Sequence, residues 1–278
     1  MGYPAGASTR AGNAEETTMR KPGSILAAAV LLAALLAPGC ATPGPAESPP
    51  PKDGPLQHYK LAQAYFEQGN APLALEEIRK AIRMAGREAK ILPVLYYYEG
   101  YVHWSREAWE DAARAFRRAL EANPGYTDAS MLLATCLEKL GRPREAIDVL
   151  TRALANRAYA FPEKIWLNRA LIEKRMGRTD LALADLRRAV EVRPQYYRGH
   201  WELARLLEEL GRADEALAEY GVAAPGFPDD PLFLYEWGSA LFRAGRMDEA
   251  AGHLRRVLEL APGSTWAEKA KELLEVIG

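Results

Sequence analysis

The sequence has few cysteines and no excess of charge of either sign. Its two cysteines, Cys40 and Cys136, are too few for a disulfide framework or for a zinc site built from thiolates. The 36 Lys and Arg residues are balanced by 37 Asp and Glu residues, which gives a formal net charge of -1. This composition supplies no positive excess to neutralise phosphates, so nucleic acid is not an expected partner.

Signatures of catalysis and of cofactor binding are also missing. No glycine-rich phosphate loop or nucleophile elbow is present. The four histidines lie far apart, without the spacing of metal ligands. They are His58, His103, His200 and His253. We therefore expect a protein that is not an enzyme and that has no metal, cofactor or small-molecule substrate.

There is one long apolar run, from Ile25 to Ala37. It holds about 13 residues, whereas a membrane-spanning helix needs roughly 20. A basic pair directly after Met19 precedes the run, and small residues follow it, as in a secretory signal peptide. We expect residues 1–39 to be this signal, with Met19 as the natural start.

The run ends in LAPGC, Leu36 to Cys40, which resembles a bacterial lipobox. The usual leucine three residues before the cysteine is Ala37 here, and Leu36 lies one place further back. The resemblance implies cleavage before Cys40 and a palmitate-type lipid anchor on that cysteine. Because Ala41 is not aspartate, it also implies the outer membrane, on its periplasmic face. The alternative is a signal cleaved without lipidation, which would remove Cys40 or leave it as a free thiol.

The next segment is rich in proline. Residues 41–55 contain six prolines and no large apolar residue. Such a composition favours an extended chain over packed structure. We expect residues 40–55 to be a lipidated tether that holds a soluble domain away from the membrane.

From residue 56 onward the sequence repeats itself. A glycine followed five residues later by an alanine recurs in five stretches, and a sixth stretch has Glu107 in place of the glycine. The recurrent alanines are Ala74, Ala112, Ala146, Ala182, Ala216 and Ala250. Their spacing is typical of the tetratricopeptide repeat, in which a turn joins two helices. We expect an all-α fold over residues 56–278, a right-handed superhelix of six tetratricopeptide repeats with a C-terminal capping helix.

The recurrent residues have physical reasons. A glycine can take a positive φ where the first helix of a repeat ends. The alanine lets the second helix approach the first, and a large and a small apolar residue follow on the same face, as at Leu186 and Ala189. Cys136 lies on the apolar side of a first helix, so we expect it to be a small buried residue.

The candidate binding surface is the concave groove that first helices line in this architecture. If the turn residue is counted as the fifteenth of its repeat, the second, fifth, ninth and twelfth residues face the groove. The predicted groove residues are Tyr59, Phe66, Tyr97, Tyr101, Trp104, Trp201, Arg205, Tyr235 and Phe242. Tyr and Trp bury a large area at a small entropic cost, so we expect an apolar peptide of a protein partner.

Two further observations concern this groove. Some of its rings could instead fill the space between neighbouring repeats. The Lys and Asn pattern of chaperone-binding clamps, which grip a C-terminal carboxylate, is missing, since Tyr59 and Gln63 occupy the corresponding positions. An acidic C-terminal tail is therefore not an expected ligand.

A lipobox, a tether and six repeats together resemble the type IV pilus biogenesis lipoproteins of the PilF, PilW and Tgl kind, the pilotins of the outer-membrane secretin. The loop before the fourth repeat adds an aromatic residue followed by Pro162 and Glu163, with Asn168 on the next helix. Where that family continues Asn-Leu-Gly, this chain has Arg169 and Ala170. The resemblance implies a protein that binds secretin subunits and promotes their assembly in the outer membrane.

The repeats are also compatible with a second interpretation. A general envelope adaptor could use the same groove for peptidoglycan enzymes, proteases or outer-membrane assembly factors. Both interpretations are protein–protein interaction functions at a bacterial membrane, and they differ in the identity of the partner.

Overall fold

The structure, a computed structural model, describes residues 54–86 and 89–278. The predicted signal peptide, the lipidation site at Cys40 and nearly all of the tether lie outside these residues. Within the described ranges all regular structure is helical, which confirms the all-α fold class. No helix in these ranges combines the length and apolar character needed to cross a membrane.

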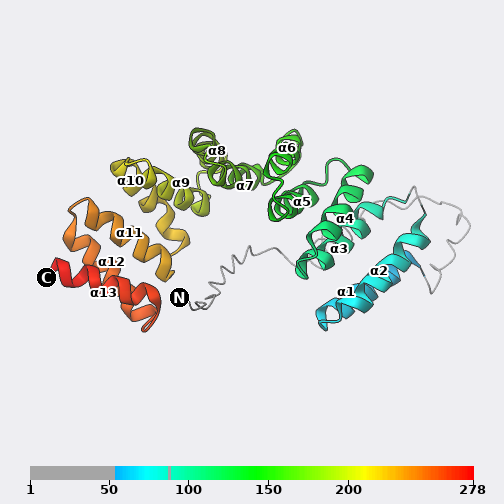
Figure 1. Cartoon of the computed structure of the whole chain (residues 1–278), viewed down its shortest axis with the longest axis horizontal. Helices are drawn as coiled ribbons and strands as arrows, with labels where there is room; N and C mark the ends of the chain where they lie inside the picture. Colours follow the sequence, from blue (N-terminus) through cyan, green and yellow to red (C-terminus); the bar gives the residue numbers. More distant parts are fainter. Residues whose placement is uncertain (1–53, 87–88) are drawn as a thin grey trace, which may run out of the picture. The chain divides into compact units, whose positions relative to one another are not determined.

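Helical hairpins follow one another along the described chain, one for each predicted repeat (Figure 1). The first helices of the hairpins are α1 (Pro55–Glu67), α3 (Leu92–Ser105), α5 (Thr127–Lys139), α7 (Pro162–Arg175), α9 (Tyr197–Glu209) and α11 (Pro231–Arg243). The second helices are α2 (Ala71–Ala85), α4 (Trp109–Ala122), α6 (Pro143–Ala153), α8 (Thr179–Val192), α10 (Ala213–Ala223) and α12 (Met247–Leu260). A short 3-10 turn, η2 (Ala224–Gly226), precedes α11, and α13 (Thr265–Ile277) follows α12.

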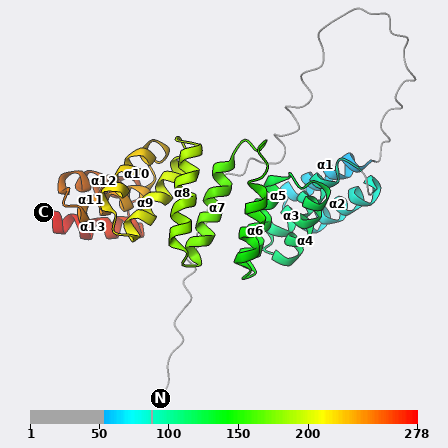
Figure 2. The same cartoon turned by 90° about the horizontal axis from the view of Figure 1, so that it is seen from above.

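The hairpins pack in chain order. Figure 2 shows consecutive hairpins side by side along the array. In Figure 1, α5, α7 and α9 lie on the inner side of the array, and α6, α8 and α10 lie on the outer side. The first helices therefore line the concave side, as the repeat pattern predicts.

The turn inside each hairpin has the predicted backbone conformation. Gly177 has a φ of 73°. Its N–H donates to the carbonyl of Lys174 and the N–H of Arg178 donates to the carbonyl of Glu173, each at 2.9 Å. These bonds satisfy the last carbonyls of α7 in a Schellman arrangement. Glu107 takes the place of the glycine in the second repeat with a φ of 58°, so a residue with a Cβ adopts the same left-handed conformation there.

The core runs between the two helices of each hairpin and on into the next hairpin. The six recurrent alanines are all fully buried, and so is Phe116, the large residue that follows Ala112. Gly100 of α3 lies directly against the Phe116 ring. A Cβ at this position would lie only 2.7 Å from the ring, so there is no room for a larger residue. The equivalent residues of the other repeats are also small and buried, and they are Ala62, Ala134, Ala170, Ala204 and Gly238.

The helix α13 covers the last hairpin as predicted. The Ser264 hydroxyl caps it by accepting a hydrogen bond from the N–H of Ala267 at 3.2 Å. Trp266 packs on Tyr235 of α11 with ring centroids 5.4 Å apart, and Ala270 is fully buried. This helix therefore closes the apolar face that α11 and α12 would otherwise expose.

Candidate functional site

We use the term concave face for the inner-side surface of α1, α3, α5, α7, α9 and α11. Of the nine predicted groove residues, seven are half-buried on this face. The other two, Tyr59 and Trp201, are each only 3% exposed. The prediction is corrected at these two positions, because side chains so deeply buried cannot serve as exposed anchors for a partner.

The packing around the two buried rings explains the difference. Tyr59 lies edge-on to Tyr98 of the next repeat, with ring centroids 5.3 Å apart. Trp201 packs against Phe227 and Phe233 at 4.7 and 5.3 Å. Both rings therefore fill the space between neighbouring repeats, which is the alternative that the sequence left open.

Four half-buried rings form what we call the aromatic patch, namely Phe66, Tyr97, Tyr101 and Trp104. Tyr101 stacks on Trp104 with a centroid separation of 6.0 Å and an interplanar angle of 15°. Phe66 lies edge-on to Tyr101 at 5.6 Å. These three rings hold one another in place, and Tyr97 packs on Phe116 at 5.8 Å, so their partly exposed surfaces are available at a small entropic cost.

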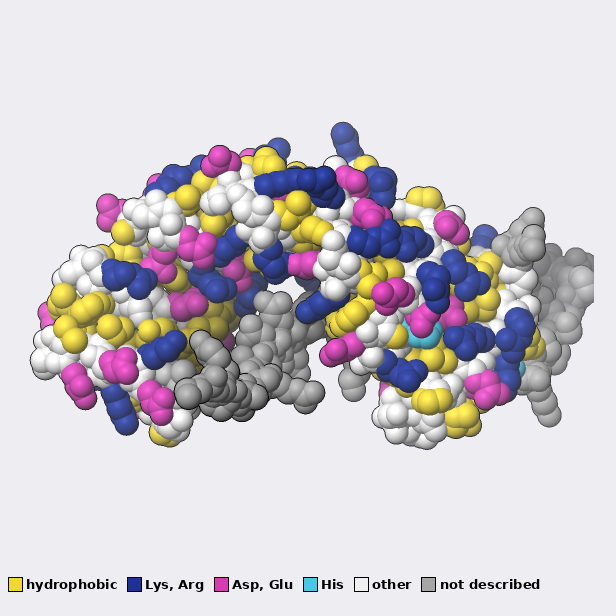
Figure 3. Space-filling view, in the orientation of Figure 1, with side chains coloured by type: hydrophobic (Ala, Val, Ile, Leu, Met, Phe, Trp, Pro, Cys, Tyr) yellow, Lys and Arg dark blue, Asp and Glu magenta, His cyan; other side chains and the backbone are white. Residues whose placement is uncertain are grey.

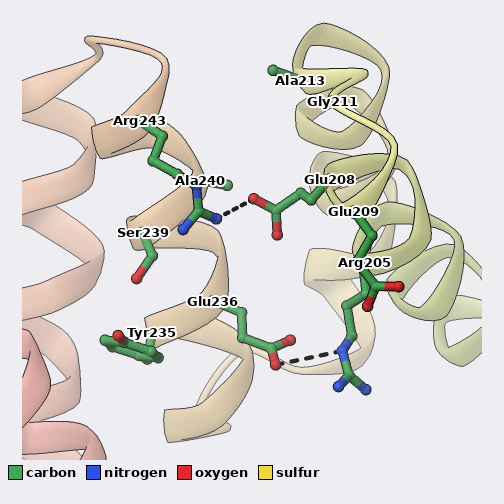
Figure 4. A pocket seen from close by; sticks show the side chains of 10 residues that line it. All are labelled: Arg205, Glu208, Glu209, Gly211, Ala213, Tyr235, Glu236, Ser239, Ala240 and Arg243. Atoms are coloured by element: carbon green, nitrogen blue, oxygen red, sulfur yellow. Dashed lines mark hydrogen bonds and ion pairs between the residues drawn. The ribbon is translucent and has the colours of Figure 1, made fainter.

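The concave face of the last two repeats is charged instead. A groove with a volume of about 530 Å³ lies between α9 and α11, and it includes Arg205 and Tyr235 of the predicted set (Figure 4). Two ion pairs cross it, one with its arginine on α9 and the other with its arginine on α11. The Nε of Arg205 on α9 is 3.5 Å from Oε1 of Glu236 on α11, and Arg243 on α11 pairs with Glu208 on α9.

The burial of Glu236 affects its ionisation. Burial raises the pKa of Glu236, although Arg205 and the indole N–H of Trp201 favour its charged form. Its two neighbours therefore compensate the desolvation of the carboxylate only in part.

Further ion pairs join the first helices of successive repeats, and we call these contacts the ion-pair ladder. The Nζ of Lys174 lies 2.7 Å from Oε1 of Glu209, one repeat further on. A second rung is Arg175 with Glu138, and the ladder also includes the two pairs of the groove, Arg243 with Glu208 and Arg205 with Glu236. Figure 3 shows basic and acidic side chains interspersed over the visible surface, not gathered into fields of one sign. The charges of the ladder are thus neutralised within the chain.

Two tyrosines outside the counted positions add to the concave face. Tyr126 directly precedes α5, and its ring centroid is 4.9 Å from that of Tyr97. Tyr159 lies in the segment between α6 and α7, and its hydroxyl donates to Oδ1 of Asp128 at 3.1 Å. Sequence reasoning missed both residues because it considered only positions within the helices.

The described residues give no sign of metal or thiol chemistry. In residues 54–86 and 89–278, no group of three or more His, Cys, Asp or Glu side chains could hold a metal ion. Cys136 is fully buried, as expected, and burial raises the pKa of its thiol to about 12. A thiol in this state is unreactive at neutral pH.

Comparison with family models supports the repeat assignment. Models of the tetratricopeptide repeat match residues 103–158 and, in two overlapping stretches, residues 167–231 and 221–265. Together these stretches run from the end of α3 in the second repeat to the end of the sixth repeat, with residues 159–166 between them unmatched. Among curated proteins, Protein DIA2 of Eremothecium gossypii is 30% identical over 114 residues, which are 41% of this chain and only 16% of that protein.

Two solved structures of similar fold match most of the chain. PilW, described as a widely conserved type IV pilus biogenesis factor, is 21% identical with a TM-score of 0.64, and the match covers 78% of this chain and 98% of PilW. PilF of Pseudomonas aeruginosa is 18% identical with a TM-score of 0.65, and the match covers 78% of this chain and 96% of PilF. At these identities the similarity shows a common fold.

Proposed function

Because the chain belongs to the tetratricopeptide-repeat family, we propose that it is a protein-interaction scaffold that binds secretin subunits and promotes their assembly in type IV pilus biogenesis. The main support is the fold match along 98% of PilW and 96% of PilF. A match of this extent includes most of the chain, 78% in both cases, and not merely one shared hairpin.

The proposal includes a location. Cys40 carries a lipid that anchors the protein to the outer membrane, and residues 41–55 let the repeat domain work in the periplasm. The support is the lipobox-like LAPGC sequence together with the proline-rich segment that follows it. Mass spectrometry of the purified protein should find a lipid on Cys40, and Cys40→Ala should release the protein from the membrane fraction. A Cys40→Ala protein that stays in the membrane, together with a wild-type protein that shows no lipid mass, would contradict the anchor.

The aromatic patch is the proposed contact surface for the partner. Tyr101 and Trp104 are stacked, half-buried and close to Phe66. Truncation of a Tyr or Trp that anchors an interface typically costs 2 kcal/mol or more of binding free energy. Tyr101→Ala combined with Trp104→Ala should therefore abolish a partner interaction of micromolar affinity.

The proposal is tested in the bacterium that encodes the protein. Deletion of the gene should abolish secretin multimers that resist heat and detergent, and the Tyr101→Ala, Trp104→Ala variant should reproduce this loss. The control is Leu181→Ala, which removes a side chain 52% exposed on α8, away from the patch. Normal multimers in the deletion strain would exclude the secretin role and would favour a general envelope adaptor.

A further inference from the structure

One carboxylate of the concave face differs from the others. Three acidic residues occupy the counted groove positions, and two of them, Glu138 and Glu208, form rungs of the ion-pair ladder. The third is Asp128, in the first turn of α5. Its hydrogen bond comes from the Tyr159 hydroxyl, and no Lys, Arg or His within the described ranges forms an ion pair with it. Asp128 thus carries an unneutralised charge, whereas the other two carboxylates at the counted positions are paired.

Three tyrosines lie near this carboxylate: Tyr159 bonds to it directly, and Tyr97 and Tyr126 form a ring pair beside the start of α5. Tyr97 comes from α3, Tyr126 directly precedes α5, and Tyr159 comes from the segment before α7. All three are half-buried, and the Tyr159 hydroxyl also lies 4.0 Å from the sulfur of Met131. Burial raises the pKa of each tyrosine, and the negative charge of Asp128 raises it further. The geometry agrees with these directions, because the Tyr159 hydroxyl is 3.1 Å from Asp128 and the Tyr97 and Tyr126 rings are 4.9 Å apart.

A structural role accounts for only part of this arrangement. A carboxylate in the first turn of a helix interacts favourably with the helix N-terminus. That interaction explains an acidic residue at position 128. It does not require the hydroxyl of Tyr159, from a separate segment, to bond to this side chain, nor the partial burial of a carboxylate without a basic partner.

We propose that Asp128, Tyr97, Tyr126 and Tyr159 form a niche on the concave face that binds an arginine or lysine side chain of the protein partner. A carboxylate can accept two parallel N–H bonds from a guanidinium, and phenol oxygens can accept further ones. Aromatic rings attract cations as well. Arginine fits better than lysine, because its planar group is less strongly hydrated and stacks on rings.

The niche adds a chemical detail to the proposed function. It rests on that function, because it assumes that the chain binds a protein partner. Tyr97 of the niche and Tyr101 of the aromatic patch lie four residues apart on α3, so the two surfaces are neighbours on one helix face. The partner segment accordingly carries apolar side chains for Phe66, Tyr101 and Trp104 and a basic side chain next to them.

The test uses two defined probes and the full chain. N-acetyl-arginine amide carries the guanidinium, and N-acetyl-citrulline amide is its neutral counterpart of equal size. In an NMR titration, the arginine probe should shift tyrosine ring signals saturably, and the citrulline probe should not. Asp128→Asn should weaken the arginine response at least fivefold. Glu138→Gln, which removes a carboxylate already paired with Arg175, should leave it unchanged.

Three results of the NMR titration would contradict the niche. No saturable shift with the arginine probe, equal shifts with both probes, or an unchanged response in Asp128→Asn would each overturn the niche. Asp128→Glu keeps the charge, so it should retain binding of the arginine probe. Comparing it with Asp128→Asn separates the effect of losing the charge from the effect of a disturbed fold. The titration contains no secretin, so the niche and the proposed pilus role can fail independently of each other.

Discussion

The indole Nε1 of Trp201 donates a hydrogen bond to Oε2 of Glu236, 2.7 Å away on the first helix of the next repeat. The same ring lies under the guanidinium of Arg198, which is 4.8 Å from its centroid. The contact joins two consecutive repeats through a partly buried carboxylate. Trp201 is therefore a structural link between the fifth and sixth repeats.

Replacing Trp201 by phenylalanine keeps an aromatic ring but removes the donor. A hydrogen bond to a charged group contributes about 1.5–3 kcal/mol, so Trp201→Phe should lower the free energy of unfolding by at least that amount. Chemical denaturation followed by circular dichroism measures the change. Trp266→Phe is the control, since Trp266 packs on Tyr235 through ring contact, and it should lose clearly less stability. Equal losses in the two variants would show that the hydrogen bond is unimportant.

Replacing Glu107 by glycine should make the protein more stable. Its φ of 58° is left-handed, a conformation that costs a residue with a Cβ about 1–2 kcal/mol. Glu107→Gly should therefore raise the free energy of unfolding by about 1 kcal/mol, because the greater freedom of glycine in the unfolded chain offsets part of the gain. The same change at Glu76, an exposed residue inside α2, should cost about 1 kcal/mol. A loss of stability in Glu107→Gly would refute the strain argument.

Gly100 should not tolerate even a methyl group. A Cβ at this position would lie 2.7 Å from the buried Phe116 ring. Overpacking of this kind typically costs 1–3 kcal/mol, so Gly100→Ala should lower the melting temperature. Gly221→Ala is the matched control, because a Cβ on that helical glycine of α10 has nothing within 4 Å. It should be neutral or stabilising, since alanine is the better helix former.

His200 should make stability depend on pH. Its Nδ1 is 2.5 Å from Oε2 of Glu219, and its Nε2 is 3.0 Å from the carbonyl oxygen of Pro194. Burial alone would lower the pKa of His200, but these two acceptors outweigh it and raise the pKa above its ordinary value. The stabilisation is thus fully present below the unfolded pKa of about 6.5 and is lost as pH rises through the folded pKa.

The measurement compares the wild type with His200→Gln over a range of pH. The difference in free energy of unfolding between them should be largest near about pH 5.5 and should shrink as the pH rises beyond the folded pKa. Using the difference cancels the contributions of His103 and His253, whose pKa values burial lowers. A difference that grows with rising pH would mean that His200 is neutral in the folded state.

Much of the fold follows from short-range patterns. The turn glycines and the recurrent alanines predict both the hairpins and their order, because each of these residues serves one local requirement of backbone geometry or helix approach. The small residue that faces Phe116 recurs just as regularly, from Ala62 to Gly238. These small residues are visible in the sequence. Why they must be small becomes clear only when the structure shows which large side chain lies against them.

The candidate site follows less well from the sequence. Counting positions places Tyr59 and Tyr97 on the same side of their helices, yet one is buried and the other is half-exposed. The difference depends on the ring that the next repeat offers, which is Tyr98 in the case of Tyr59. Tyr159 reaches the concave face from a connecting segment, and no helical periodicity can predict such a position.

The ion-pair ladder has a mechanical consequence. Its rungs, such as Lys174 with Glu209, connect first helices on the inner side of the third to sixth repeats. Partly exposed ion pairs weaken as ionic strength rises, whereas the ring contacts of the aromatic patch do not depend on charge. Rising salt should therefore loosen the contacts between these charged first helices while it leaves the ring contacts of the aromatic patch unchanged.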